Sequence, residues 1–280
     1  MSGGSPRVGV VGHVEWIDFA VVPRVPRPGE ILAATASFQE AAGGGSVAAV
    51  QMRKLAGRAE FFTVLGDDEL ADRCFDELTA RHGLDVFAAR RDQPQRRGWT
   101  YLDDRHERTI TVIGERLVPR GDDDIPWERM RDLDAVYLTG GDVAAARKAR
   151  AAGILVATPR AMDALRGSGV ELDVLVASAT DAGERIDAAD LRPPPRHIVL
   201  TEGAEGGTWR GVDGRTGRWK AVAPPGAPVD SYGSGDSFAA GLAYGLGAGM
   251  SLDDALETAA RCGAWCLTGR GPYGNQFTLA

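Results

Sequence analysis

The pattern most suited to chemistry in this sequence is Asp-Ser-Tyr-Gly-Ser-Gly-Asp, residues 230–236, directly before a long helical pattern. Gly233, Ser234 and Gly235 allow a tight turn whose N–H groups point at one spot, where a helix start adds positive charge. Asp236 then places a carboxylate beside this anion hole. The pair suits phosphoryl transfer, with N–H groups holding the phosphoryl charge and the carboxylate accepting the hydroxyl proton. A plain glycine turn capped by Ser234 or Asp236 is an equal alternative.

Short apolar stretches alternate with helical or polar stretches along most of the chain, which predicts an α/β fold with a mostly parallel sheet and helices on both faces. The last third carries a glycine-studded helix after Asp236, and Ser251 is the predicted N-cap of the next helix. Helices are also predicted over 46–56 and 68–82. The predicted strands are 7–12, 61–65, 135–138, 154–157, 174–177 and 197–201.

Two segments interrupt this alternation. Residues 14–40 are predicted to be extended, and residues 98–114 are predicted to form a hairpin because Trp, Tyr, Thr and Ile flank an Asp-Asp-Arg-His turn. They could form a small sheet beside the main domain, or two surface hairpins without a function.

Composition narrows the classes of function. The chain has 280 residues, 44% hydrophobic and 25% charged, as in ordinary globular proteins, and a net charge of −7 that argues against a nucleic-acid partner. Three cysteines make no disulfide framework, so we expect a cytoplasmic location. No uninterrupted apolar stretch reaches the roughly 18 residues of a membrane span, and we expect no membrane partner.

Several motifs, in order and spacing, resemble the ribokinase-like carbohydrate kinases of the PfkB family. The motifs are RVPRPGEIL (24–32), AGGGSVAAVQMRKLAG (42–57), LGDDELADRCFDEL (65–78), TEGAEGG (201–207) and DSYGSGD (230–236). The resemblance implies a single three-layer α/β/α domain over 1–280 with a small β-sheet lid formed by about 14–40 and 86–115. It also implies that lid closure excludes water, and that two lids could pair in a homodimer.

The resemblance also implies roles for single residues. Asp236 would be the general base, with the anion hole formed by Gly233, Ser234 and Gly235. ATP would be the donor, with Mg²⁺ bridging its phosphates. Asp230 would either sit at a potassium site or fix its loop as a hydrogen-bond acceptor. The nucleotide would lie near Thr201, Gly203, Gly206 and Gly271.

On the acceptor side the sequence departs from the family pattern. Ser46 stands about where the family has a sugar-binding Asn, and Ile17 stands where ribokinases have an Asp. Asp18, Gly44 and Ser46 are the candidate substrate contacts. Trp16 could stack on a sugar or base, or could pack in the core.

The metal side departs as well. The family usually has Asn-x-x-Glu after a middle strand, and this chain has Ser178-Ala-Thr-Asp181. Asp181 could still order a magnesium-bound water, although activity could also be weak. Arg160, after an upstream strand, could touch a phosphate or lie in solvent.

The leading interpretation is an ATP-dependent kinase that phosphorylates a hydroxyl of a sugar or sugar-like molecule. A nucleoside kinase of the same fold and a catalytically weak sugar- or nucleoside-binding homologue are alternatives, because the sugar and metal motifs are altered. A dinucleotide-dependent oxidoreductase fits poorly, since the first strand leads into Gly-His-Val-Glu and not into a G-x-G-x-x-G turn.

Overall fold

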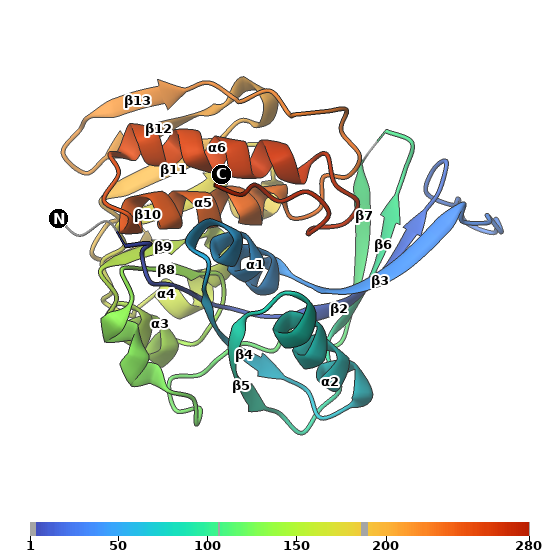
Figure 1. Ribbon diagram of the computed structural model, residues 1–280, viewed down its shortest axis with the longest axis horizontal. Helices are drawn as coiled ribbons and strands as arrows, with labels where there is room; N and C mark the ends of the chain where they lie inside the picture. The colour runs from blue at the N-terminus through green and yellow to red at the C-terminus, as the bar shows by residue number, and fades with distance from the viewer. Residues whose placement is uncertain (1–3, 106, 186–189, 280) are drawn as a thin grey trace.

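The computed structural model describes residues 4–105, 107–185 and 190–279, and shows a layered body with a small sheet projecting from one end (Figure 1). Within this part of the chain nine strands form the main sheet, in the order β13-β12-β11-β10-β9-β8-β1-β4-β5. Neighbouring strands are parallel from β11 to β5, and β12 and β13 continue the sheet as antiparallel partners. The strands are β1 (Val8–Val11), β4 (Glu60–Leu65), β5 (Asp85–Arg90), β8 (Ala135–Leu138), β9 (Ile154–Ala157), β10 (Val174–Ser178), β11 (His197–Thr201), β12 (Gly207–Gly211) and β13 (Thr216–Trp219).

Helices cover both faces of the main sheet, as predicted for a three-layer α/β/α fold. The central strands are apolar and buried on both sides, and alternate residues enter two separate cores, for example Val10 one core and Val11 the other. The first core is covered by α1 (Gly44–Ala56), α5 (Ser234–Gly247) and α6 (Leu252–Cys266), and the second by α3 (Val143–Ala149) and α4 (Met162–Leu165).

Side-chain caps begin several helices, and the cap at Ser251 was predicted from the sequence, whereas α1 begins at Gly44 without a side-chain cap. Asp68 caps α2 (Glu69–Asp76), which continues as a π-helical turn, Glu77–Arg81. The Ser251 hydroxyl accepts a hydrogen bond from the Asp254 N–H at the start of α6. No helix in the described ranges is long and apolar enough to cross a membrane.

The four remaining strands form the small sheet, in the order β3-β2-β6-β7, and the predicted hairpin over 98–114 is confirmed. Its strands are β2 (Glu15–Val21), β3 (Ala36–Ala42), β6 (Arg97–Leu102) and β7 (Arg108–Ile113). Side chains alternate between two faces. The inner face carries Phe19, whose ring meets the Tyr232 ring edge-on at 5.2 Å, just ahead of α5. The outer face carries Trp16, Asp18, Gln39, Arg97, Trp99 and Ile113.

Helix α5 packs closely on α6 because Gly241 has no side chain. A Cβ at this position would lie 2.7 Å from the Cys262 sulfur and 2.9 Å from the Ala259 Cα. Such distances cannot be accommodated unless the helices separate.

We therefore expect Gly241→Ala to lower the free energy of unfolding by about 1–3 kcal/mol, because the added methyl group overpacks the α5–α6 interface. Urea unfolding followed by circular dichroism measures this. Gly226→Ala is the matched control: a Cβ there meets nothing within 4 Å, so its stability should change by less than about 0.5 kcal/mol. Equal stability of the two variants would show that the helices separate without cost.

Candidate active site

Asp236 lies in the first turn of α5, beyond the carboxyl ends of the central parallel strands. Gly233 precedes the helix in the left-handed conformation, with a φ of 80°. No side chain caps α5, and the Ser234 hydroxyl instead donates to the Ser231 carbonyl oxygen at 3.1 Å. The turn is thus not the side-chain-capped turn that the sequence left open. Without a cap, the N–H groups of this helix start suit an anion.

Gly44, at the start of α1, lies directly against the Asp236 carboxylate. A Cβ on Gly44 would stand 2.7 Å from the Asp236 Oδ1 and 3.3 Å from the Thr139 Oγ1. The structure therefore brings the predicted substrate residue Gly44 together with the predicted base, and the missing side chain is what permits this approach.

The surroundings of Asp236 make it a carboxylate that can take up a proton near neutral pH. Burial, and then the negative charge of Glu184, raise its pKa to about 6, against the opposing effects of Arg108, Arg160 and Arg116. The Tyr137 hydroxyl donates to Oδ1 at 3.5 Å. Burial also raises the pKa of Tyr137, so this hydroxyl keeps its proton.

Beyond the ends of β9 and β10, two carboxylates hold one guanidinium. Arg160 Nη2 lies 2.7 Å from Asp181 Oδ2, and its Nε lies 3.3 Å from Glu184 Oε1. Glu184 also accepts a hydrogen bond from the Ser178 N–H at 2.9 Å. Asp181 is thus where the sequence placed it, after β10. Glu184 was not predicted, because the family motif has its acid three residues after the position of Ser178. The short turn Ala182–Glu184 brings this later acid back to Ser178.

The predicted nucleotide residues lie at the end of β11 and around the loops beside it. Thr201 ends β11, and Gly203 and Gly206 have positive φ values of 59° and 88°. A side chain on Gly206 would collide with the Trp219 carbonyl oxygen of β13. Gly271 has a φ of 65° and donates its N–H to Asp230 at 2.9 Å.

Asp230 joins two loops of the site through its carboxylate. It is 1% exposed, and its oxygens accept hydrogen bonds from the N–H groups of Tyr232, at 2.7 Å, and Gly271, at 2.9 Å. This geometry fits the loop-fixing role. The described residues contain no group of three His, Cys, Asp or Glu side chains placed to hold a metal ion.

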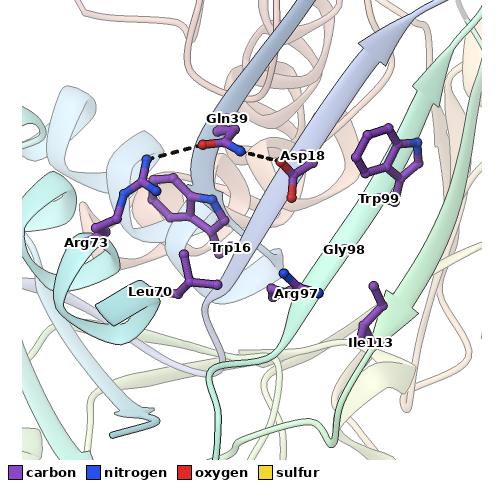
Figure 2. A pocket seen from close by; sticks show the side chains of 9 residues that line it. All are labelled: Trp16, Asp18, Gln39, Leu70, Arg73, Arg97, Gly98, Trp99 and Ile113. Carbon is purple, nitrogen blue, oxygen red and sulfur yellow. Dashed lines mark hydrogen bonds between the residues drawn. The ribbon is translucent and has the colours of Figure 1, made fainter. Parts of the chain in front are cut away.

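Two predicted substrate residues are not turned toward Asp236. Ser46 is fully buried, donates to the Gly43 carbonyl oxygen at 3.0 Å, and accepts from the Tyr273 hydroxyl at 3.1 Å. Asp18 lies on the outer face of the small sheet, where it accepts a hydrogen bond from Gln39 (Figure 2).

A cavity of about 270 Å³ opens on this outer face, away from Asp236. Trp16 lines it, 4% exposed, with the Arg73 guanidinium 4.1 Å from its ring centre (Figure 2). Trp16 therefore packs against α2 and does not face the reaction centre. The cavity is lined by Trp16, Asp18, Gln39, Leu70, Arg73, Arg97, Gly98, Trp99 and Ile113.

A second cluster of polar residues, which was not predicted from the sequence, lies beyond the ends of β1 and β8. Arg116 Nη2 lies 2.9 Å from the His13 Nδ1 and 2.7 Å from the Thr139 carbonyl oxygen. Glu15 lies 3.4 Å from the other nitrogen of His13 and 3.0 Å from the Arg96 Nε. No local motif announces this group, since its members come from separate parts of the chain.

Comparison with known proteins gives the same assignment as the motifs. Residues 157–277 match the family described as pfkB family carbohydrate kinase. The chain is 28% identical to the acarbose 7(IV)-phosphotransferase of Actinoplanes sp., covering 92% of this chain and 91% of that protein. It is 29% identical to the ATP-dependent ribose-1-phosphate kinase of Halopiger xanaduensis, covering 92% and 90%.

The fold is shared with solved structures. The ribokinase of Arabidopsis thaliana, solved with ribose and ATP, superposes with a TM-score of 0.75 at 19% identity, covering 97% of this chain and 96% of that one. The match extends over both sheets, so the small sheet is part of the ribokinase-like fold. In sequence, the C-terminal part of the chain is thus similar to the pfkB family of carbohydrate kinases, and the whole chain has the ribokinase-like fold.

Proposed function

We propose that this kinase transfers the γ-phosphoryl group of ATP to a hydroxyl of a sugar or sugar-like molecule, with Asp236 as general base. The observation that carries this proposal is the position of Asp236, in the first turn of an uncapped helix and against Gly44. A carboxylate with a pKa of about 6 is ionised at neutral pH and still basic enough to accept a hydroxyl proton.

The chain's own residues divide the work. Asp236 takes the proton of the acceptor hydroxyl. The N–H groups of the turn Gly233, Ser234 and Gly235 face the charge that develops on the transferred group, in an environment fixed before the reaction. Gly44 keeps the acceptor side of Asp236 free of a side chain.

ATP would lie at the loops after β11, where Gly203, Gly206 and Gly271 let the backbone approach a nucleotide closely. The ribokinase of A. thaliana, with the same fold, was solved with ATP. Asp181, with Glu184 beside it, fits the oxygen chemistry of Mg²⁺, which would supply charge neutralisation on the phosphates. Asp230 would contribute to a potassium site through its loop, although both its oxygens already accept backbone hydrogen bonds.

The small sheet would act as the lid of a single kinase domain over 1–280. Of the segments predicted to form the lid, about 14–40 and 86–115, residues 86–90 belong instead to β5 at the edge of the main sheet. Arg108 of β7 already reaches the anion-hole segment, where its Nη1 donates to the Ser231 carbonyl oxygen at 2.9 Å. A lid in this place would exclude water from the transferred phosphoryl group.

We expect Asp236→Asn to lower kcat by about 10²–10⁴-fold, because the amide cannot accept the hydroxyl proton. Coupled ADP release over a panel of sugars, polyols and nucleosides, with Mg-ATP and with or without K⁺, measures this. Asp253→Asn, an exposed acid in the first turn of α6, is the matched control and should keep full activity. An Asp236→Asn enzyme with undiminished turnover would refute the base assignment. Ligand binding without turnover in the wild type would support a binding homologue instead.

The pH dependence follows from the raised pKa of Asp236. Because the base works in its ionised form, kcat should fall as the pH drops through about 6. Glu184 raises that pKa, so Glu184→Gln should move the acid limb of the kcat profile to lower pH. Glu128→Gln, an exposed acid at the amino end of β8, should leave the limb in place. A limb that does not move in Glu184→Gln would mean that another group controls it.

We further propose that two lids pair in a homodimer through their outer faces, where Trp99 and Ile113 are 43% and 47% exposed. Light scattering coupled to size exclusion should then give twice the mass of one chain. Trp99→Glu should halve this mass, since a buried unpaired carboxylate would weaken the interface. Val212→Glu, which charges a more exposed apolar site after β12, should not. A monomeric wild-type protein would exclude this pairing.

A further inference from the structure

Arg116 is a partly buried guanidinium whose recorded partners are all neutral. It donates to the His13 Nδ1, to the Thr139 carbonyl oxygen and, through Nη1 at 2.8 Å, to the Arg160 carbonyl oxygen. Within the described ranges no carboxylate lies within 4 Å of it. A buried cation without a counter-ion is costly, and an arginine keeps its charge at any ordinary pH.

The neutral state of His13 is part of this arrangement. Burial, followed by the charges of Arg116, Arg96 and Arg160, lowers the pKa of His13 well below its ordinary value. His13 therefore accepts from Arg116 at Nδ1 and carries its proton on Nε2, which faces Glu15 at 3.4 Å. It orients Arg116 without offering it any charge.

The carboxylates that act on Arg116 electrostatically are committed elsewhere. Glu15 pairs with Arg96 at 3.0 Å, and burial raises its pKa. Asp236 has a raised pKa and is the proposed base. Arg160, by contrast, has two carboxylates of its own, Asp181 and Glu184. Of Arg96, Arg116 and Arg160, Arg116 is thus the arginine without a recorded carboxylate partner within 4 Å.

The place of Arg116 along the sheet indicates which reactant it faces. The strand ends run in the order β1, β8, β9, β10, β11. The nucleotide residues follow β11, and the Asp181 and Glu184 carboxylates follow β10. His13 and Thr139 follow β1 and β8, and Gly44 lies beside Thr139. Arg116 therefore stands at the acceptor end of the site. β1 is also a point where the chain order of the sheet reverses, which is where open α/β sheets bind ligands.

We infer that the acceptor carries an anionic group, a phosphate monoester or a carboxylate, in addition to the hydroxyl that is phosphorylated, and that Arg116 binds this group. The inference rests on the proposed kinase function, because it concerns the acceptor end of that same site. A guanidinium has five N–H donors, and the recorded contacts of Arg116 use four, which leaves one on Nη1. An incoming anion would supply both an acceptor and the missing charge.

Equilibrium binding without nucleotide tests this on the full chain. Calorimetry compares D-ribose with D-ribose 1-phosphate and D-ribose 5-phosphate, and D-glucose with D-gluconate, so that the phosphate and carboxylate arms are read separately. We expect at least one anionic compound to bind more than about tenfold more tightly than its neutral parent. Arg116→Gln should remove that preference, with a loss of about 10–100-fold for the anion and little change for the neutral sugar.

Arg58→Gln is the matched control, since Arg58 is an exposed arginine before β4, at the opposite end of the strands. Arg116→Lys keeps the positive charge and should retain part of the preference for the anion. If Arg116→Gln does not fold, the binding of anionic and neutral sugars to the wild type and to Arg116→Lys tests the inference instead. Anionic sugars that bind no more tightly than neutral ones, or an Arg116→Gln variant that keeps the preference, would overturn the inference.

The two proposals can fail separately. Anion binding that depends on Arg116, without ADP release from any bound compound, would refute the kinase proposal and keep the inference. Turnover of neutral sugars that depends on Asp236 and is unchanged in Arg116→Gln would support the kinase proposal and refute the inference about Arg116. Because nucleotide is absent from the binding measurement, a role of Arg116 toward the phosphates of ATP alone would appear as no anion preference, and would also overturn the inference.

Discussion

The approach of the Gly44 backbone to the Asp236 carboxylate is the constraint on which the site depends. It requires the first turn of α1, which follows β3, to lie against the first turn of α5, which follows Gly233. Removing water from Asp236 raises its pKa, and in the proposed reaction the same contact would limit where an acceptor hydroxyl can stand. α1 follows β3 of the small sheet and α5 follows the loop after β13, so the packing of α1 against α5 brings these two helix starts together.

The sequence predicted well those features that depend on neighbours along the chain. The buried strands, the cap at Ser251 and the turn at Gly233 are all recognisable within a few residues. The edge strand β5 and the β12–β13 hairpin were not predicted as strands, because their residues are only partly buried and lack a clear apolar run. For such strands, pairing in the sheet outweighs local preference.

Prediction of the site was weaker where a residue's role depends on distant partners. Arg116 and His13 are 103 residues apart, and only the order of strands in the sheet brings them into contact. Asp18 illustrates a different difficulty. Successive side chains of a strand point to opposite faces of the sheet. Ile17 therefore points to the inner face of the small sheet and Asp18 to its outer face, so an error of one position in the comparison with the ribokinase motif selects a residue on the wrong face. The contact of Phe19 with Tyr232 shows which face is which.

The hydrogen bond from Arg108 to the Ser231 carbonyl oxygen places a positive charge of the small sheet next to the start of α5. That charge lowers the pKa of Asp236. If the small sheet moved away, the positive charge of Arg108 would leave the neighbourhood of Asp236. The position of the sheet and the protonation of Asp236 are therefore thermodynamically linked through this charge. Linkage is reciprocal: to the extent that Arg108 makes Asp236 a stronger acid, protonation of Asp236 weakens the hold of the sheet on the domain. Acidification would then both disable the base and loosen the cover over it.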